Sequence, residues 1–287
     1  MFRAELDALP IEELSDDPWR SQVPGKGHLC GHDGHMVMLL ALGRMLARKP
    51  VDFGRVILMF QPAEEDGSGA RAVVADPAFR QLAPDWAFAI HNEPGRPFGY
   101  VATRPGLINC ASQGLEIKLH GKTAHAASPE DGASPAQAVS DLIPALQLLG
   151  SGGELNDVFR LVTVTHVQIG EPTFGIAPGE ARIYATLRTA ADQALLDLAS
   201  TARNLASQSA LRAGLEVSFV SHDEFAASIN HAEAVQVARE AMSAIGVVHG
   251  EDGLPMRASE DFGVFGWDAK AAMLCLGAGE TYKALHN

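Results

Sequence analysis

A nine-residue stretch near the N-terminus, "GHLCGHDGH" at 27–35, is dense in side chains that bind metals. It contains His28, Cys30, His32 and His35, in a chain that has three cysteines. Thiolate and imidazole groups are ligands for zinc and for other transition metals. The alternative is a polar loop, because "GHDG" can form a turn before a helix and a lone cysteine is often a small apolar side chain. The donors elsewhere in the chain decide between these interpretations.

Further donors each follow an apolar run of strand length. They are Glu64 and Glu65 after residues 55–61, His91 at the end of 86–92, and His286 after 271–279. Ligands in open α/β sheets gather outside the carboxyl ends of the strands, so these side chains are expected to converge. The coincidence favours a metal site over isolated polar loops. His28 and His35 are expected to lie behind the ligands or against a helix.

The elements that position these donors alternate between strand and helix in the first half of the chain. The pattern predicts a helix over 37–50, a strand over 55–61 and a strand over 86–92. Between the two strands, the stretch 70–79 predicts a helix that ends at Pro77. Strand, helix and strand at this spacing favour a parallel sheet covered by helices.

The pattern changes near residue 110 to alternating, half-exposed strands. Strands are predicted over 113–122, 159–170, 181–190 and 215–222, and helices over 134–149 and 191–213. This β-α-β-β-α-β order is that of a ferredoxin-like α+β unit. A helix over 232–245 and a strand over 271–279 then return to the first pattern. We therefore expect a first domain formed by 1–109 and 223–287, with 110–222 inserted.

Composition limits the function classes. The chain has 287 residues, of which 47% are hydrophobic, and its formal net charge is −13. Such a charge repels nucleic acid and anionic membrane surfaces, so neither is an expected partner. The three cysteines are far apart, no apolar run has the length of a membrane span, and no signal peptide is apparent. A cytoplasmic location is expected.

Six motifs together resemble one family of enzymes. They are "GHLCGHDGH", "FQPAEED", "IHNEPG", "GKTAHAASPEDG", "SEDFGVF" and the terminal "LHN". In this order they resemble the aminoacylase/carboxypeptidase-type metallo-amidohydrolases. The subgroup with the greatest similarity contains hippurate hydrolases, auxin-conjugate hydrolases and N-acetyldiaminopimelate deacetylases. The resemblance implies a hydrolase that cleaves the amide bond of N-acyl amino acids to a carboxylic acid and a free amino acid.

The resemblance also implies a site. Its metal ligands would be Cys30, His32, Glu65, His91 and His286, with Glu64 as general base. Two divalent ions per subunit are implied, and the mixed sulfur, nitrogen and oxygen donors suit zinc or manganese, with cobalt or nickel also compatible. Two metals held close together can activate water and polarise an amide carbonyl.

The inserted domain has an implied role too. In the family it acts as a lid and forms a homodimer, and a histidine in the position of His125 stabilises the developing oxyanion. Arg188 matches a family position that would bind a substrate carboxylate, although an ordinary arginine on a sheet face is an equal alternative. The implied fold is α/β, with a mixed, mainly parallel catalytic sheet that has helices on both faces, plus the ferredoxin-like domain.

The chain departs from the family pattern in three ways. It starts at a strand that about seventy residues usually precede, it ends directly after His286, and Gly175 stands where the family usually has an asparagine. A sheet without its first strand and helix would expose an edge and apolar surface. The alternatives are therefore a dipeptidase or carboxypeptidase with the same site, and a shortened, inactive relative that serves in dimerisation or metal binding.

Overall fold

The computed structural model describes residues 1–281, 285 and 286 and divides into two compact units. Unit 1 consists of residues 1–109 and 225–287, and unit 2 of residues 110–224. Each unit is described by itself below. Among the described residues, no helix combines the length and apolar character needed to cross a membrane.

Unit 1 is built on a sheet of six described strands in the order β13-β4-β14-β3-β1-β2. The strands are β1 (Phe2–Glu5), β2 (Leu58–Gln61), β3 (Trp86–Pro94), β4 (Val101–Ala102), β13 (His249–Gly250) and β14 (Lys270–Gly279). All neighbouring pairs are parallel except β14 with β4. A small antiparallel pair joins β5 (Gly106–Asn109) to β12 (Ser228–Asn230). The mixed, mainly parallel sheet predicted from the sequence is confirmed.

Helices cover both faces of this sheet. On one face, α6 (Ala232–Ala244) packs Ala238 and Met242 against Leu274 of β14, and α1 (His32–Arg48) lies beside it. On the other face, α2 (Gly69–Ala75), α3 (Pro77–Leu82) and the 3-10 helix η2 (Asp261–Trp267) enclose an apolar cluster. Phe262 is 1% exposed in that cluster. Its burial contributes about 2–3 kcal/mol.

Two helix boundaries differ from the sequence prediction. Helix α1 begins at His32 rather than near residue 37, because Gly31 takes a left-handed conformation (φ 85°) that starts the helix directly after Cys30. Pro77 does end one helix as predicted, but it also occupies the first turn of α3. Its missing N–H costs nothing there, and the Asp76 carboxylate caps that turn by accepting from the Ala78 N–H at 2.7 Å.

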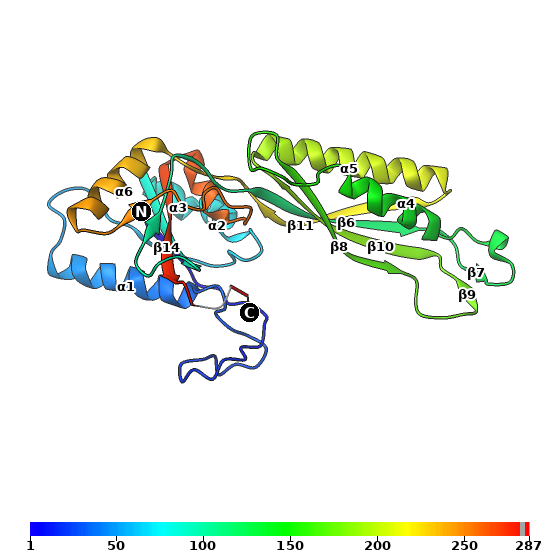
Figure 1. Cartoon of the computed structure of the whole chain (residues 1–287), viewed down its shortest axis with the longest axis horizontal. Coiled ribbons are helices and arrows are strands. Elements are labelled where there is room, and N and C mark those ends of the chain that lie inside the picture. Colours follow the sequence, from blue (N-terminus) through cyan, green and yellow to red (C-terminus); the bar gives the residue numbers. More distant parts are fainter. Residues whose placement is uncertain (282–284, 287) are drawn as a thin grey trace. The chain divides into compact units, whose positions relative to one another are not determined.

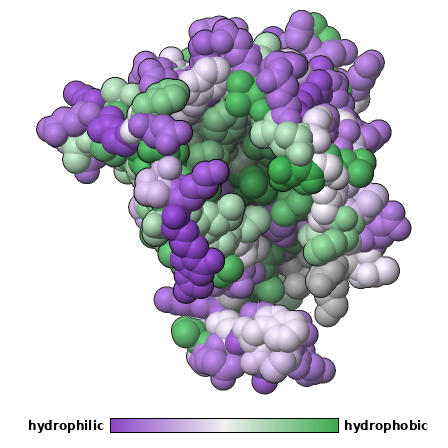
Figure 2. All heavy atoms as spheres, turned by 90° about the vertical axis from the view of Figure 1, so that its left-hand side faces the viewer, coloured by the Kyte–Doolittle hydropathy of each residue, from purple (hydrophilic) through white to green (hydrophobic). Residues whose placement is uncertain are grey.

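The sheet face between α1 and α6 is hollowed. The hollow has a volume of about 340 Å³, and its walls include Met38 and Leu42 of α1, Val237 of α6, and Phe88 and Leu274 of the sheet. Figure 2 looks onto this end of the molecule, where hydrophobic side chains gather in a recess with a hydrophilic rim.

Unit 2 has the ferredoxin-like order of elements. They are β6 (Ala111–His120), α4 (Ala136–Gln147), β8 (Arg160–Ile169), β10 (Glu180–Thr189), α5 (Asp192–Arg212) and β11 (Glu216–Phe225), joined by β7 (Ala124–His125), η1 (Pro129–Asp131) and β9 (Ile176–Ala177). The sheet order is β11-β6-β10-β8, and α4 and α5 lie along one of its faces (Figure 1). Helix α5 buries Leu195, Leu198, Ala202 and Ala206, a spacing that keeps its apolar side chains on the sheet.

Candidate metal centre

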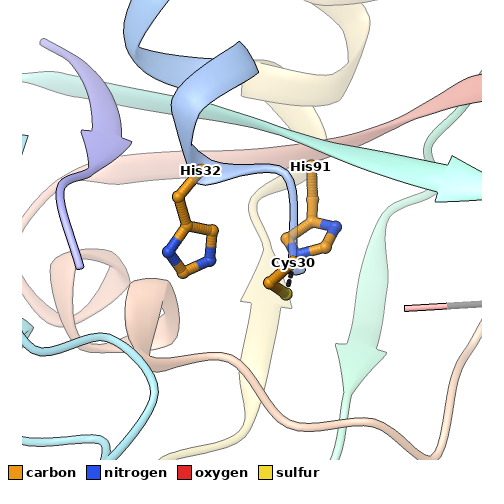
Figure 3. Close-up of side chains that lie close together, drawn as sticks. All are labelled: Cys30, His32 and His91. Carbon is orange, nitrogen blue, oxygen red and sulfur yellow. Dashed lines mark hydrogen bonds between the residues drawn. The ribbon is translucent and has the colours of Figure 1, made fainter. Parts of the chain in front are cut away.

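Three side chains from two separate segments converge in unit 1. Cys30 lies in the loop before α1, His32 is the first residue of α1, and His91 lies on β3 (Figure 3). Their ligand atoms all lie within 4.8 Å of one another, and the Cys30 Sγ is 3.5 Å from the His91 Nε2. All three residues are buried. The left-handed turn at Gly31 separates Cys30 from the first residue of α1, so the loop and the helix each contribute one donor to the same centre.

His32 presents a nitrogen lone pair to this centre. Its Nδ1–H donates to the backbone carbonyl of Asp7 at 3.0 Å, which leaves Nε2 unprotonated in the neutral ring. That Nε2 is buried, has no hydrogen-bond partner among the described residues, and lies 3.8 Å from carboxylate oxygens of Glu64 and Glu65. A buried acceptor without a partner is costly, so the ring is arranged for a ligand it does not find in the chain.

His91 is held in the same tautomer. Its Nδ1–H donates to the backbone carbonyl of Asn92 at 2.8 Å, and its Nε2 faces Cys30. Burial lowers the pKa of His91 to about 4, with a further contribution from His35. The ring is therefore neutral near pH 7 and can act as a ligand.

A second group shares Cys30 with the first. The ligand atoms of Cys30, Glu65 and His286 also lie within 4.8 Å of one another. The backbone N–H of His286 donates to the Leu29 carbonyl at 2.9 Å, and the His286 Nε2 lies 3.8 Å from the Glu65 Oε2. The Glu65 N–H donates to the Asp7 carboxylate at 3.0 Å. Cys30 belongs to both groups, so its sulfur is the donor that two ions would share.

Glu64 lies beside these groups in a less exposed position. It is 4% exposed. Its carboxylate lies within 4.8 Å of ligand atoms of His32 and Glu65, and, in a second group, of Glu260 and Asp261. Burial, followed by the charge of Glu260, raises the pKa of Glu64 well above its ordinary value. A carboxylate in such a setting takes up a proton readily.

A buried arginine lies behind the carboxylates. The Arg3 guanidinium donates to Glu5, to Glu260 at 2.8 Å and to Asp261 at 2.6 Å. Asp261 in turn accepts from the Gln61 side chain and from the Ala70 N–H. Burial opposes the charge of Arg3, but Glu260 and Asp261 outweigh it and raise the arginine pKa.

The charges of this region do not balance within the described residues. Six carboxyl groups surround or line it, namely Glu5, Asp7, Glu64, Glu65, Glu260 and Asp261. Arg3 contacts three of them, Glu5, Glu260 and Asp261. Burial, with Glu65 and Glu64 adding to it, also raises the pKa of the Cys30 thiol. Divalent cations would offset the excess negative charge and displace the thiol proton. The residues present therefore fit a dinuclear metal group in both donor type and charge.

His125 and Arg188 belong to unit 2, whereas the ligand groups belong to unit 1. His125 is exposed on β7, and its Nδ1 accepts from the Ala127 N–H at 3.1 Å, so that Nε2 carries the proton. Arg188 is half-buried on β10, where it pairs with Ser112 of β6 and Leu161 of β8. Burial lowers its pKa from the ordinary arginine value.

The sequence interpretation did not assign roles to several residues of the centre. Asp7 orients His32, and its pKa falls to about 2 because the hydrogen bonds from His32 and from the backbone of Glu65 and Glu64 outweigh the opposing effect of burial. Glu260 and Asp261 lie in the motif "SEDFGVF", whose likeness to the family was the one available signal. No local pattern marked Arg3.

Curated proteins that hydrolyse amide bonds are similar to this chain in sequence. An N-acetyldiaminopimelate deacetylase of Anoxybacillus flavithermus is 35% identical over 198 residues, which are 68% of this chain and 51% of the relative. An IAA-amino acid hydrolase of Arabidopsis thaliana is 35% identical over 188 residues, which are 65% of this chain and 42% of the relative. The chain thus spans about half the length of these curated relatives.

A solved structure and a family pattern cover the whole chain. The structure of a dinuclear metal-binding peptidase from Bacillus subtilis, a member of the M20 family, superposes with a TM-score of 0.80 and 25% identity, over 100% of this chain and 73% of that one. The pattern of peptidase family M20/M25/M40 matches residues 1–287. The chain belongs to this family.

Proposed function

We propose that this chain is a metal-dependent amidohydrolase that cleaves the amide bond of N-acyl amino acids. The observation that carries the proposal is the pair of ligand groups that share Cys30, with the carboxylate of Glu64 beside them. The names of the relatives, an N-acetyldiaminopimelate deacetylase and an IAA-amino acid hydrolase, support amides of this kind as substrates.

The donors would bind two metal ions, and Glu64 would transfer the proton. Cys30, His32 and His91 would hold one divalent ion, and Cys30, Glu65 and His286 the other, with zinc or manganese as the expected metals. When bound, such ions supply Lewis-acid activation of water and of the amide carbonyl. Glu64 would take a proton from the attacking water and pass it to the nitrogen of the leaving amine.

Unit 2 would bind the substrate and a second subunit. His125 carries its proton on Nε2 and could donate it in a hydrogen bond to the developing oxyanion, while Arg188 could bind the substrate carboxylate through two parallel hydrogen bonds. Strand β8 lies at one edge of the unit 2 sheet, and an unpaired edge can pair with a second copy. The three cysteines are buried and form no disulfide with one another, which fits the proposed cytoplasmic location.

The test compares substrates and two acid-to-amide variants. Protein loaded with zinc or manganese is assayed on acetyl- and benzoyl-amino acids and on dipeptides, and its metal content is measured in the same sample. Glu64→Gln should lower kcat by at least ~10² without loss of metal, because it removes the general base. Asp66→Asn, an exposed acid two residues away, should match the wild type.

Three results would contradict parts of the proposal. Full activity of Glu64→Gln would exclude its role as the general base. Cleavage of dipeptides alone would replace the deacylase by a peptidase. Absence of all hydrolysis in protein with two metals per chain would favour the inactive relative.

A further inference from the structure

Strands β1 and β3 separate at the metal centre. Their backbones pair at Phe2 with Phe88 and at Arg3 with Ala89, and the pairing stops there. On its other side, β1 continues to pair with β2 as far as Glu5, and β3 continues to pair with β14 through His91. The two central strands therefore diverge before the level of His91, so the ladder between them does not fix the position of this ligand.

His35 of α1 fills the opening with side-chain hydrogen bonds. It is 3% exposed and lies about one turn after His32. Its Nδ1–H donates to Glu5 Oε2, at the end of β1, at 2.7 Å. Its Nε2 accepts from the backbone N–H of Asn92, on β3, at 3.0 Å. One imidazole thus connects the two strands where their own pairing has ended.

The protonation of His35 is consistent with this connection. The neutral ring carries one proton, which the Glu5 contact places on Nδ1, and keeps a lone pair on Nε2 for Asn92. The Asn92 Oδ1 also lies 2.8 Å from Nε2. With the amide turned so that its NH₂ faces the ring instead, Asn92 donates a second hydrogen bond to Nε2.

Asn92 transmits the restraint to His91. Its backbone carbonyl accepts the His91 Nδ1–H at 2.8 Å and so keeps His91 Nε2 directed at Cys30. Asn92 also packs on Gly31, where an added Cβ would lie 2.3 Å from the Asn92 Oδ1. The His35 and His91 rings are in edge contact, with centroids 5.0 Å apart. Asn92 is therefore held between α1 and the turn that carries Cys30.

We propose that His35 is a positioning residue that links Glu5 to Asn92 and thereby fixes His91 for metal binding. The inference rests on the proposed metal centre, and it assigns a distinct task to each ring nitrogen. The Nε2 contact with Asn92 governs the affinity for the metal that His91 holds. The Nδ1 contact with Glu5 anchors the ring to the sheet.

Three variants separate the two contacts. The amide of His35→Gln reaches the position of Nε2 and keeps an acceptor for the Asn92 N–H. The amide of His35→Asn reaches the position of Nδ1 and keeps a donor for Glu5. His35→Phe keeps the ring and removes both contacts. His231→Ala is the control, because it removes the cap of α6, where Nδ1 accepts the Glu233 N–H at 3.2 Å, without touching the metal centre.

The affinity of each protein for Co²⁺ is measured by competition with a chelator. Metal content is then determined, and the absorption bands of bound Co²⁺ and of its bond to the Cys30 thiolate are recorded. His35→Asn and His35→Phe should bind one of two ions about 10–100-fold more weakly, the usual effect of removing a partner behind a metal ligand. His35→Gln should remain within a few-fold of the wild type. His231→Ala should lose thermal stability but keep both affinities.

The outcomes distinguish the inference from the metal centre itself. Wild-type protein that binds no Co²⁺ would overturn both. Two ions in the wild type with unchanged affinity in His35→Asn, or equal losses in His35→Asn and His35→Gln, would overturn the role of His35 alone. If His35→Phe does not fold, the comparison of His35→Asn with His35→Gln still decides the question.

Discussion

Metal binding should raise the stability of unit 1 through Cys30. In the part of the chain that the structure describes, Glu5, Glu260 and Asp261 share one guanidinium, that of Arg3. A ligand that binds only the folded state stabilises it by about 4 kcal/mol when its free concentration is 1,000-fold above Kd. Each kcal/mol shifts Tm by roughly 2–4 °C in a domain of about 150–250 residues. One filled site should therefore raise the Tm of unit 1 by roughly 8–16 °C.

The assay compares two buried cysteines of unit 1. Tm is measured with zinc in excess and with a chelator, for wild type, Cys30→Ala and Cys275→Ala. Cys275 is 0% exposed on β14 and lies in an apolar cluster, so its replacement should lower Tm by the same amount in both conditions. Cys30→Ala should lose most of the difference between the conditions, because the shared ligand of both groups is gone.

Any of three results would refute this reasoning. A wild-type Tm that does not respond to any of the expected divalent ions would remove the metal centre. A metal-dependent shift of full size in Cys30→Ala would show that the thiolate is not a ligand. Equal loss of the shift in Cys275→Ala would mean that a general weakening of unit 1, rather than ligand loss, explains the effect.

Further predictions concern pH, catalysis and substrate binding. With a chelator present, the free energy of unfolding should fall as pH rises between about 4.5 and about 10, by up to about 1.4 kcal/mol per pH unit for each retained proton, because burial raises the pKa of Glu64 from its ordinary value of 4.5 to about 10 in the folded state. Urea titrations of the wild type and Glu64→Gln check this, and the variant should show the smaller slope. His125→Ala should lower kcat by about 10²–10³, with Tm and metal content unchanged, if its Nε2–H stabilises the oxyanion. Gly175→Asn should change the free energy of unfolding by less than about 0.5 kcal/mol, since an added Cβ meets nothing within 4 Å, and steady-state kinetics should show a changed KM.

The sequence predicts most elements of the fold because their patterns are local. The alternation over 181–190 predicts β10 (Glu180–Thr189), and the apolar run over 271–279 predicts β14 (Lys270–Gly279), each to within a residue or two. The start of α1 is five residues earlier than predicted. Neither apolar periodicity nor a side-chain cap marks the start of this helix in "CGHDGH". The helix starts there because Gly31 takes a left-handed backbone conformation, which the sequence pattern does not reveal.

The candidate ligands were predictable for a different reason. Glu65, His91 and His286 follow strands that reach the same edge of a sheet, so the rule for α/β proteins brings them together without any knowledge of their contacts. Glu260 was not predictable in this way. It is buried because Arg3 neutralises it, and that partner lies 257 residues away in the sequence. Acids of this kind are normally exposed, and only a long-range contact reveals the exception.

The period of a single strand connects these distant contacts. Side chains of alternate residues point to the same face, and Arg3, Glu5 and Asp7 are alternate residues of β1 and its continuation. The Arg3 side chain reaches the acids of η2, the Glu5 carboxylate accepts from His35 of α1, and the Asp7 carboxylate lies 3.5 Å from Nδ1 of the candidate ligand His32. A slip of one residue in the pairing of β1 with β2 would turn all three away together. The same register that places β1 in the sheet therefore determines the charge balance, the strand link and one ligand of the candidate metal centre.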